Sequence, residues 1–162
     1  ELIASGRASY KTYNDQGWLY LYLSRPEEAL ASFKTSVEMD TSAVISQVFL
    51  ANALRETGEF TASLDILNKL LALKMDTYTN NIKCWTLYKM DKAEEAVTCY
   101  NSTIEFEPDH PEAYYRLGWI FWEMEKWELA AEYYDLCDEI SSGYKSTKWY
   151  QNSLKILIHN RD

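Results

Sequence analysis

The chain has 162 residues, of which 47% are hydrophobic and 15% aromatic, with only 5 glycines and 3 prolines. This composition excludes a disordered chain and is poor in the turn residues of a sandwich or barrel, so it favours one mostly helical domain. The formal net charge of -9 disfavours nucleic acid and anionic membrane, because both are bound through clustered Lys and Arg. The apolar runs are too short and too interrupted for membrane insertion.

Residues 1–9 match no later segment and are expected to be a lead-in or the end of a preceding helix. From residue 10 on, apolar periodicity and turn residues predict pairs of short antiparallel helices. The first helix of each pair, helix A, is expected near 10–23, 44–57, 78–90 and 111–124. The second, helix B, is expected near 26–39, 60–74, 93–106 and 127–140.

A ninth helix is predicted after the turn "SSGYKS", over residues 146–159. Its apolar residues stand at i, i+4, i+7 and i+8: Tyr150, Leu154, Leu157 and Ile158. Because a stack of repeats leaves its last hydrophobic face open, we expect this helix to act as a cap.

The pairs repeat at a fixed period. One column of small residues in helix B has spacings of 34, 33 and 34: Ala29, Ser63, Ala96 and Ala130. Four positions later stand large apolar or aromatic residues: Phe33, Leu67, Tyr100 and Tyr134. Helix A has its own column of small residues, Gly17, Ala51, Cys84 and Gly118. Small residues within a helix let a neighbouring helix approach closely, so each unit is predicted to be a packed helix pair.

The chain resembles the tetratricopeptide repeat (TPR) family, whose signature is W-x2-L-G-x2-Y, then A-x3-F, then P. The fourth unit matches best, with Tyr114, Leu117, Gly118 and Phe121, then Ala130 and Tyr134. The third has the final Pro108 but departs at Asn80 and Lys83, and the second has Gln47 for the first aromatic. The resemblance implies an all-α, right-handed superhelical α-solenoid of four TPR-like helix pairs plus a C-terminal capping helix. Its expected repeats are 10–43, 44–76, 77–110 and 111–142, with the cap in 143–162.

Catalytic motifs are missing from the sequence. It has no Gly-rich phosphate loop, HExxH or GxSxG, and only 2 histidines. The paired carboxylates at the ends of helix B are more simply a solvated face. The sequence therefore predicts a protein that is not an enzyme and uses no cofactor or metal.

The three cysteines, Cys84, Cys99 and Cys137, have no metal-binding or CxxC spacing, so reduced and buried thiols are expected. Reduced thiols suit a cytoplasmic location. The chain begins at Glu1 and shows no signal peptide, which predicts a fragment or processed form.

The family resemblance implies that the A helices line a concave surface. In the fourth A helix, Tyr115, Trp119 and Trp122 form a second stripe, turned away from the signature stripe. We predict that this aromatic surface, with nearby Asn and Arg, binds a peptide or segment of a neutral or basic protein partner. The candidate peptide-binding residues are Asn14, Trp18, Tyr22, Asn52, Arg55, Asn81, Trp85, Tyr88, Tyr115, Trp119 and Trp122.

Several alternatives stay open at this point. Tyr115 and Trp122 could pack between neighbouring A helices, or the cap could fold into the groove. Recognition of an acidic chaperone tail is disfavoured, because the cationic residues that the family uses for it are not in place. Besides a scaffold, the resemblance allows a small secretion-type chaperone for hydrophobic clients or the regulatory arm of a larger enzyme. Self-association through the open N-terminal face would give a homo-oligomer.

Overall fold

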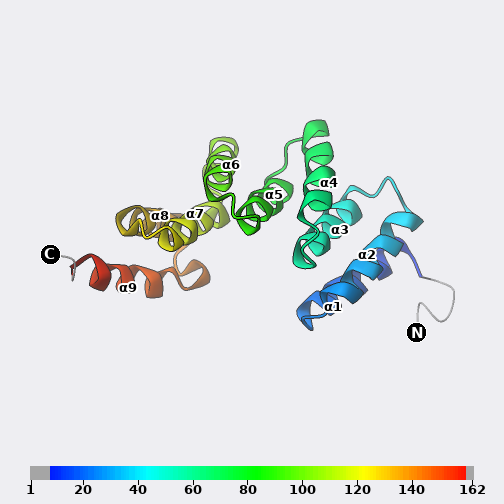
Figure 1. Ribbon diagram of the computed structural model, residues 1–162, viewed down its shortest axis with the longest axis horizontal. Coiled ribbons are helices and arrows are strands. Elements are labelled where there is room, and N and C mark those ends of the chain that lie inside the picture. The colour runs from blue at the N-terminus through cyan, green and yellow to red at the C-terminus, as the bar shows by residue number, and fades with distance from the viewer. Residues whose placement is uncertain (1–7, 160–162) are drawn as a thin grey trace. The chain divides into compact units, whose positions relative to one another are not determined.

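The computed structural model describes residues 8–159, which form nine α-helices and one short 3-10 turn, with no strand among these residues (Figure 1). The first four helices are α1 (Tyr10–Tyr22), α2 (Pro26–Met39), α3 (Val44–Glu56) and α4 (Phe60–Leu73). The next four are α5 (Thr77–Lys89), α6 (Ala93–Phe106), α7 (Pro111–Glu123) and α8 (Trp127–Ile140). The last described elements are the 3-10 turn η1 (Tyr144–Ser146) and α9 (Thr147–His159). All nine predicted helices are confirmed, with limits within one residue of those expected.

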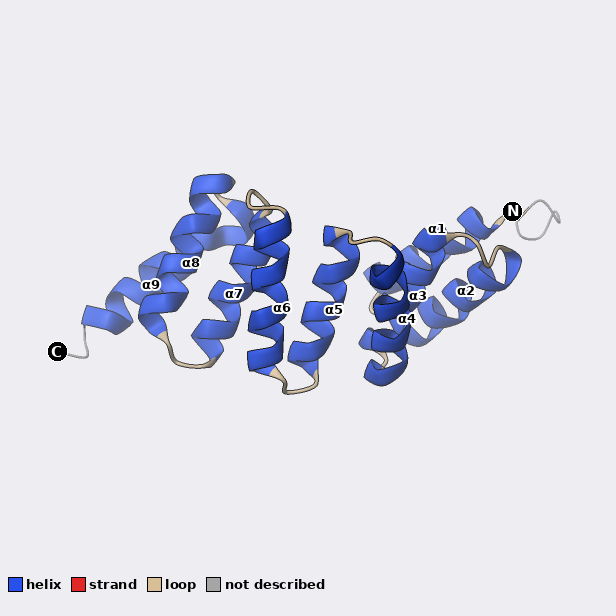
Figure 2. Cartoon of the chain, turned by 90° about the horizontal axis from the view of Figure 1, so that it is seen from above, coloured by secondary structure: helices blue, strands red, loops and turns tan. Residues whose placement is uncertain are grey.

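The chain divides into two compact units, residues 1–86 and 87–162, hereafter unit 1 and unit 2. The division falls inside α5. In unit 1, α2 packs against both α1 and α3, and α3 packs against α4. In unit 2, α7 packs against α6 and α8, and α9 packs against α8 (Figure 2). Within each unit these helices therefore contact their neighbours in sequence, as expected for stacked helix pairs.

Every turn from an A helix to a B helix has the same backbone conformation. Its central residue has a positive φ: Ser24 (56°), Gly58 (85°), Asp91 (60°) and Glu125 (56°). The following amide then donates to a carbonyl five residues earlier, as from Lys126 to Phe121 at 2.9 Å. This Schellman motif closes the end of helix A. A left-handed residue with a Cβ is strained, so only Gly58 is well suited to this position.

We expect Glu125→Gly to stabilise the protein by about 0.5–1 kcal/mol, because the strain relieved exceeds the entropy that glycine adds to the unfolded chain. Gly58→Ala, at the equivalent position, should have the opposite sign. Urea unfolding of the two variants beside the wild type would measure both changes. A loss of stability in Glu125→Gly would contradict the assignment of strain to this turn.

The unit 1 core depends on a close approach of α1 and α2. The Phe33 ring is fully buried against Gly17, where an added Cβ atom would lie 2.5 Å from the ring. The equivalent position in the next pair is Ala51, which packs in one cluster with the smaller Leu67. In this unit a glycine therefore accompanies an aromatic partner, and an alanine accompanies a leucine.

The cysteines only partly follow the prediction. Cys137 is a free, buried thiol whose sulfur donates to the Pro111 carbonyl at 3.3 Å. Burial raises the pKa of this thiol to about 11, which keeps it protonated. Cys84 and Cys99, in contrast, are disulfide-bonded, so the prediction of reduced thiols is wrong for these two. Among residues 8–159, no helix is both long and apolar enough to cross a membrane.

Candidate functional site

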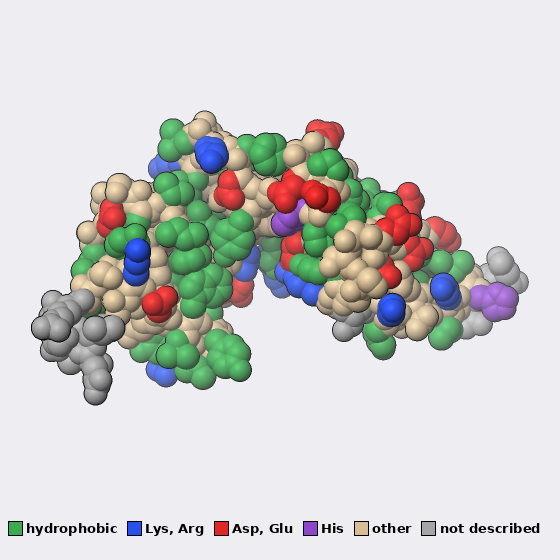
Figure 3. All heavy atoms as spheres, turned by 180° about the vertical axis from the view of Figure 1, so that it is seen from behind, with side chains coloured by type: hydrophobic (Ala, Val, Ile, Leu, Met, Phe, Trp, Pro, Cys, Tyr) green, Lys and Arg blue, Asp and Glu red, His purple; other side chains and the backbone are tan. Residues whose placement is uncertain are grey.

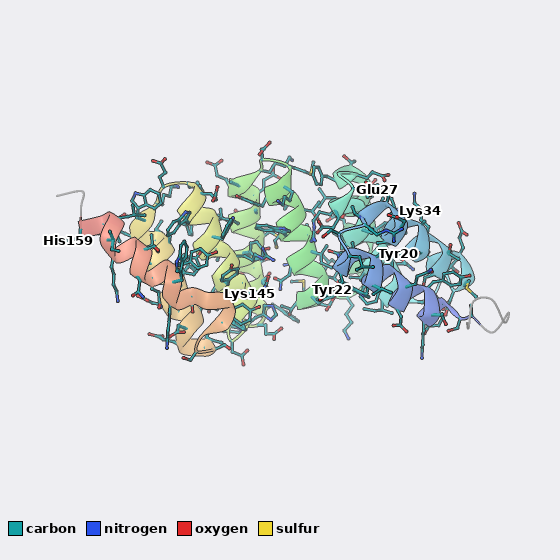
Figure 4. All side chains as sticks on the ribbon, turned by 90° about the horizontal axis from the view of Figure 1, so that it is seen from below. Tyr20, Tyr22, Glu27, Lys34, Lys145 and His159 are labelled. Atoms are coloured by element: carbon teal, nitrogen blue, oxygen red, sulfur yellow. The ribbon has the colours of Figure 1, made fainter. Side chains whose placement is uncertain are left out.

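The predicted peptide-binding residues differ widely in exposure. Trp18 and Tyr22 in α1 are exposed, by 38% and 85% of their surface. Two are buried, namely Asn14 and Asn52. The other seven are half-buried: Arg55, Asn81, Trp85, Tyr88, Tyr115, Trp119 and Trp122. Figure 3 shows hydrophobic side chains gathered on one face of unit 1, and Figure 4 shows Tyr22 near the end of α1. Unit 1 thus holds the open aromatic surface.

Trp18 is held in place although its surface is partly open. Its ring lies edge-on to Phe49 of α3, with 5.1 Å between ring centroids, and edge-on to Phe33 of α2 at 6.1 Å. Edge-to-face contacts of this kind fix a ring without covering both of its faces. Trp18 is therefore a pre-positioned side chain that can contact a partner at little entropic cost.

The Asn14 amide points into the protein. Its nitrogen donates to the Ser46 hydroxyl at 3.0 Å, and Ser46 in turn lies 3.0 Å from the Ser36 hydroxyl. Ser36 also donates to the Tyr10 carbonyl at 2.8 Å, so this network joins α1, α2 and α3. The network gives Asn14 a structural role, and peptide binding by this residue stays a prediction.

Arg55 lies in the last turn of α3. Its side chain is only 12% exposed and forms an ion pair with Glu56. Burial raises the pKa of Tyr78 in α5, and the nearby Arg55 charge opposes that rise. A role of Arg55 in peptide binding stays a prediction.

In unit 2 the structure brings together four of the predicted residues. Trp119 in α7 donates its indole N–H to the Tyr88 hydroxyl in α5. Burial raises the pKa of Tyr88, and this hydrogen bond opposes the rise. Tyr115 and Trp122 lie one turn to either side of Trp119 along α7.

A tyrosine from the C-terminal helix covers these rings. The Tyr150 ring of α9 lies 6.1 Å from Tyr115, 5.9 Å from Trp119 and 5.7 Å from Trp122, between centroids. It stacks on Tyr134 of α8 at 4.8 Å with planes 14° apart. We call the surface that Tyr150 touches the aromatic platform: Tyr115, Trp119, Trp122 and Tyr134. Of the alternatives left open by the sequence, a C-terminal helix that covers these aromatic side chains matches this contact.

A group of charged and polar side chains holds the start of the C-terminal segment. Glu112 of α7 accepts hydrogen bonds from Tyr144 and Lys145, and from Arg116 at 2.7 Å. Burial raises the pKa of Glu112, but the hydrogen bonds from Lys145 and Tyr144 outweigh it, and the net pKa is lowered. Figure 4 shows Lys145 at the start of the last helix and His159 at its end.

We expect the stability of the C-terminal segment to fall as the pH drops below about 4.5, because a carboxyl with a lowered folded pKa stabilises only while it is ionised. The contribution is complete above the unfolded pKa and is lost as the pH falls through the folded one. Glu112→Gln should remove this pH dependence, and Glu128→Gln, at an exposed position of α8, should not. Hydrogen exchange of α9 at pH 6 and pH 3, corrected for intrinsic rates, would test both.

The residues that sequence reasoning missed lie in the C-terminal segment. The sequence predicts Tyr144 and Lys145 only as part of a turn, and Tyr150 only as part of an apolar helix face. Leu157 was expected to be on that face but is exposed, whereas Thr147 is buried there. In the described part of the chain, no group of three or more His, Cys, Asp or Glu could hold a metal ion.

Comparison with known protein families finds matches along most of the chain. Tetratricopeptide repeat models match residues 14–76 and 111–144, and a TPR repeat model matches residues 86–125. A search of curated proteins finds no match.

Solved structures with a similar fold are TPR proteins. TTC0263, a thermophilic TPR protein in Thermus thermophilus, has a TM-score of 0.79 at 11% identity, covering 93% of this chain and 83% of that one. A tetratricopeptide repeat protein from Parabacteroides merdae ATCC 43184 gives 0.69 at 15%, and 93% of this chain spans only 60% of its length. YrrB, a TPR protein with an unusual peptide-binding site, gives 0.59 at 18%, with 93% and 78% covered.

The family matches and the fold agree with the repeated features of the chain. The helix pairs and the turn after each A helix recur at the period that the sequence shows, and the contact of Gly17 with Phe33 is repeated by Gly118 with Tyr134. The chain belongs to the tetratricopeptide repeat family, and its fold is the all-α solenoid of helix pairs with a C-terminal helix packed on the last pair.

Proposed function

We propose that the chain is a non-catalytic interaction module that binds a partner segment, with Trp18 and Tyr22 of unit 1 as the main contacts. The observation that carries the proposal is the exposure of these two large rings, one turn apart on α1. Trp18 is already fixed by Phe49 and Phe33, so little side-chain freedom is lost on binding. Large rigid aromatic side chains of this kind supply most of the binding energy at protein interfaces.

The chemistry around the two rings indicates the kind of partner. An extended segment with apolar side chains would bury the rings, and each ring buried contributes about 1.5–3 kcal/mol. Two such rings give micromolar binding at best, once the free-energy cost of ordering the partner segment and the interface side chains is subtracted. The net charge of -9 favours a neutral or basic segment over an acidic one. YrrB has a peptide-binding site, and the shared fold makes peptide binding a reasonable proposal for this chain too.

The proposal is tested with peptides selected from a displayed random library on the immobilised wild-type chain. We expect Tyr22→Ala to weaken the selected peptides about tenfold or more, because it removes a principal contact. Leu73→Ala is a matched control, since Leu73 on α4 is 83% exposed but lies outside the predicted site. Fluorescence anisotropy would give each affinity. Equal binding by the two variants, or a failure to select any peptide, would count against binding at α1.

A further inference from the structure

The aromatic platform already holds a helix. In α9, the residues turned toward the rest of unit 2 are Thr147, Tyr150, Gln151 and Leu154, and of these Thr147 and Leu154 are fully buried. The opposite side exposes Lys148, Asn152 and Lys155. The platform thus receives an amphipathic helix whose apolar stripe is one aromatic ring followed four residues later by a leucine.

Polar contacts set the position of this helix. Gln151 donates to the Asp135 carboxylate at 2.8 Å, and the Thr147 hydroxyl lies 3.2 Å from Asp138. Glu112 accepts from Lys145 and Tyr144, at the start of the segment. Such contacts fix register and orientation, but partly exposed ones add little binding energy.

Three features oppose the docking of α9 on the rest of unit 2. It fully buries two residues, whereas α7 buries five. The Tyr134 ring stacks on Tyr150, and its hydroxyl is buried with no hydrogen-bond partner among the described residues, which opposes the packing at this contact. The connecting Lys145 has a left-handed backbone with φ of 42°, a strain that is relieved when the segment is released.

We propose that the aromatic platform is a docking site for an amphipathic helix of a partner protein, with an aromatic ring and a leucine four residues apart, and that α9 occupies it as an internal ligand. A partner helix is free of the strained Lys145 connection. A partner that also offers an oxygen acceptor to the Tyr134 hydroxyl would gain a hydrogen bond that α9 does not make. Such a helix would displace α9.

This inference shares one premise with the proposed function, namely that the chain binds a partner protein. The two surfaces are different, because the platform belongs to unit 2 and the Trp18 and Tyr22 surface to unit 1. Tyr22→Ala affects only the latter. Failure of the peptide selection at α1 would therefore leave the platform experiment interpretable, and failure at the platform would leave binding at α1 standing.

The test uses the full 162-residue chain and a fluorescent synthetic peptide of residues 147–159. In the chain variant Tyr150→Ala, the internal helix competes less, so the wild-type peptide should bind this variant about thirtyfold tighter than the wild-type chain. A peptide carrying Tyr150→Ala should bind neither. Ile156→Ala in the chain is the control, because Ile156 is 62% exposed on the same helix and should leave peptide binding as in the wild type.

Equal peptide affinity for the wild-type and Tyr150→Ala chains, or no binding to either, would overturn the proposal. A dimer seen by light scattering that Tyr150→Ala abolishes would also overturn it, because the occupant would then be α9 of a second copy.

A second variant provides an independent test in case the Tyr150→Ala chain folds poorly. Tyr134→Phe keeps the stacked ring and removes the unpaired hydroxyl, so α9 should dock more firmly. We expect hydrogen exchange in α9 to slow about fivefold. Faster exchange in Tyr134→Phe would show that the hydroxyl supports docking, and the inference would fail.

Discussion

Replacing Gly17 with alanine is expected to destabilise unit 1 by about 1–2 kcal/mol, although alanine is the better helix former. The added Cβ would meet three atoms of the Phe33 ring at 2.5 to 2.8 Å. Phe33 is fully buried, so its ring cannot move aside without disturbing the neighbouring side chains. The clash therefore outweighs the gain of about 1 kcal/mol in helix propensity.

The sign of the Gly17→Ala effect should reverse when the ring is removed. Phe33→Leu alone leaves a cavity and costs about 1–2 kcal/mol. In that background, Gly17→Ala recreates the pair Ala51 and Leu67 of the second repeat, so it should be neutral or stabilising by up to about 1 kcal/mol. A double-mutant cycle by urea unfolding measures the coupling. The same loss from Gly17→Ala in both backgrounds would contradict a steric origin.

The repeat explains why the fold could be predicted so closely from the sequence. A helix pair whose small and large residues recur at a fixed period has only one way to pack on its neighbour. Ala29 and Phe33 in α2 stand four residues apart, and both are fully buried. The limits of the helices follow from the turns, because the same Schellman motif ends every A helix. The local turn sequences and the packing of the repeats therefore indicate the same helix limits and the same fold.

The candidate site was less predictable, because exposure depends on contacts between distant residues. Asn14 stands in a column that the family resemblance places on the concave surface, yet it donates to Ser46, 32 residues away. A hydrogen bond between two polar side chains leaves no periodic signal in a sequence. Trp18 and Asn52 occupy equivalent positions in their repeats, but one is exposed and the other is buried. The position within a repeat thus did not determine the role of the side chain.

The two stripes on α7 were predicted correctly, but what covers the second stripe was left open. Tyr115, Trp119 and Trp122 lie together on one side of α7, and Tyr150 contacts all three. The register of α9 on α7 and α8 depends on Glu112, Asp135 and Asp138, whose charges alone resemble a solvated face. Trp119→Ala would therefore also disturb α9, and Tyr22→Ala is the better probe of peptide binding.

Removal of the Tyr150 ring is expected to release α9 from unit 2. The ring contacts the four platform rings and also lies edge-on to Trp149, at 5.0 Å. Truncating a packed aromatic side chain to alanine usually costs about 3–5 kcal/mol, and because Tyr150 is half-buried we expect about 2 kcal/mol. A loss of this size raises the population of the undocked segment about thirtyfold.

Hydrogen exchange resolves this effect from global unfolding. Amides in α9 of Tyr150→Ala should exchange about thirtyfold faster, while those of α2 and α3 in unit 1 should keep the wild-type rate. The comparison variant Ile156→Ala changes an exposed residue of the same helix and should shift the rate less than about twofold, through helix propensity alone. If α9 in Tyr150→Ala kept its wild-type exchange rate, the contacts of Glu112 and Asp138 would be sufficient to hold the helix. The Tyr150 ring would then contribute nothing to the docking of α9. Acidification separates these cases, because protonation of Glu112 weakens the polar contacts and leaves the ring packing intact.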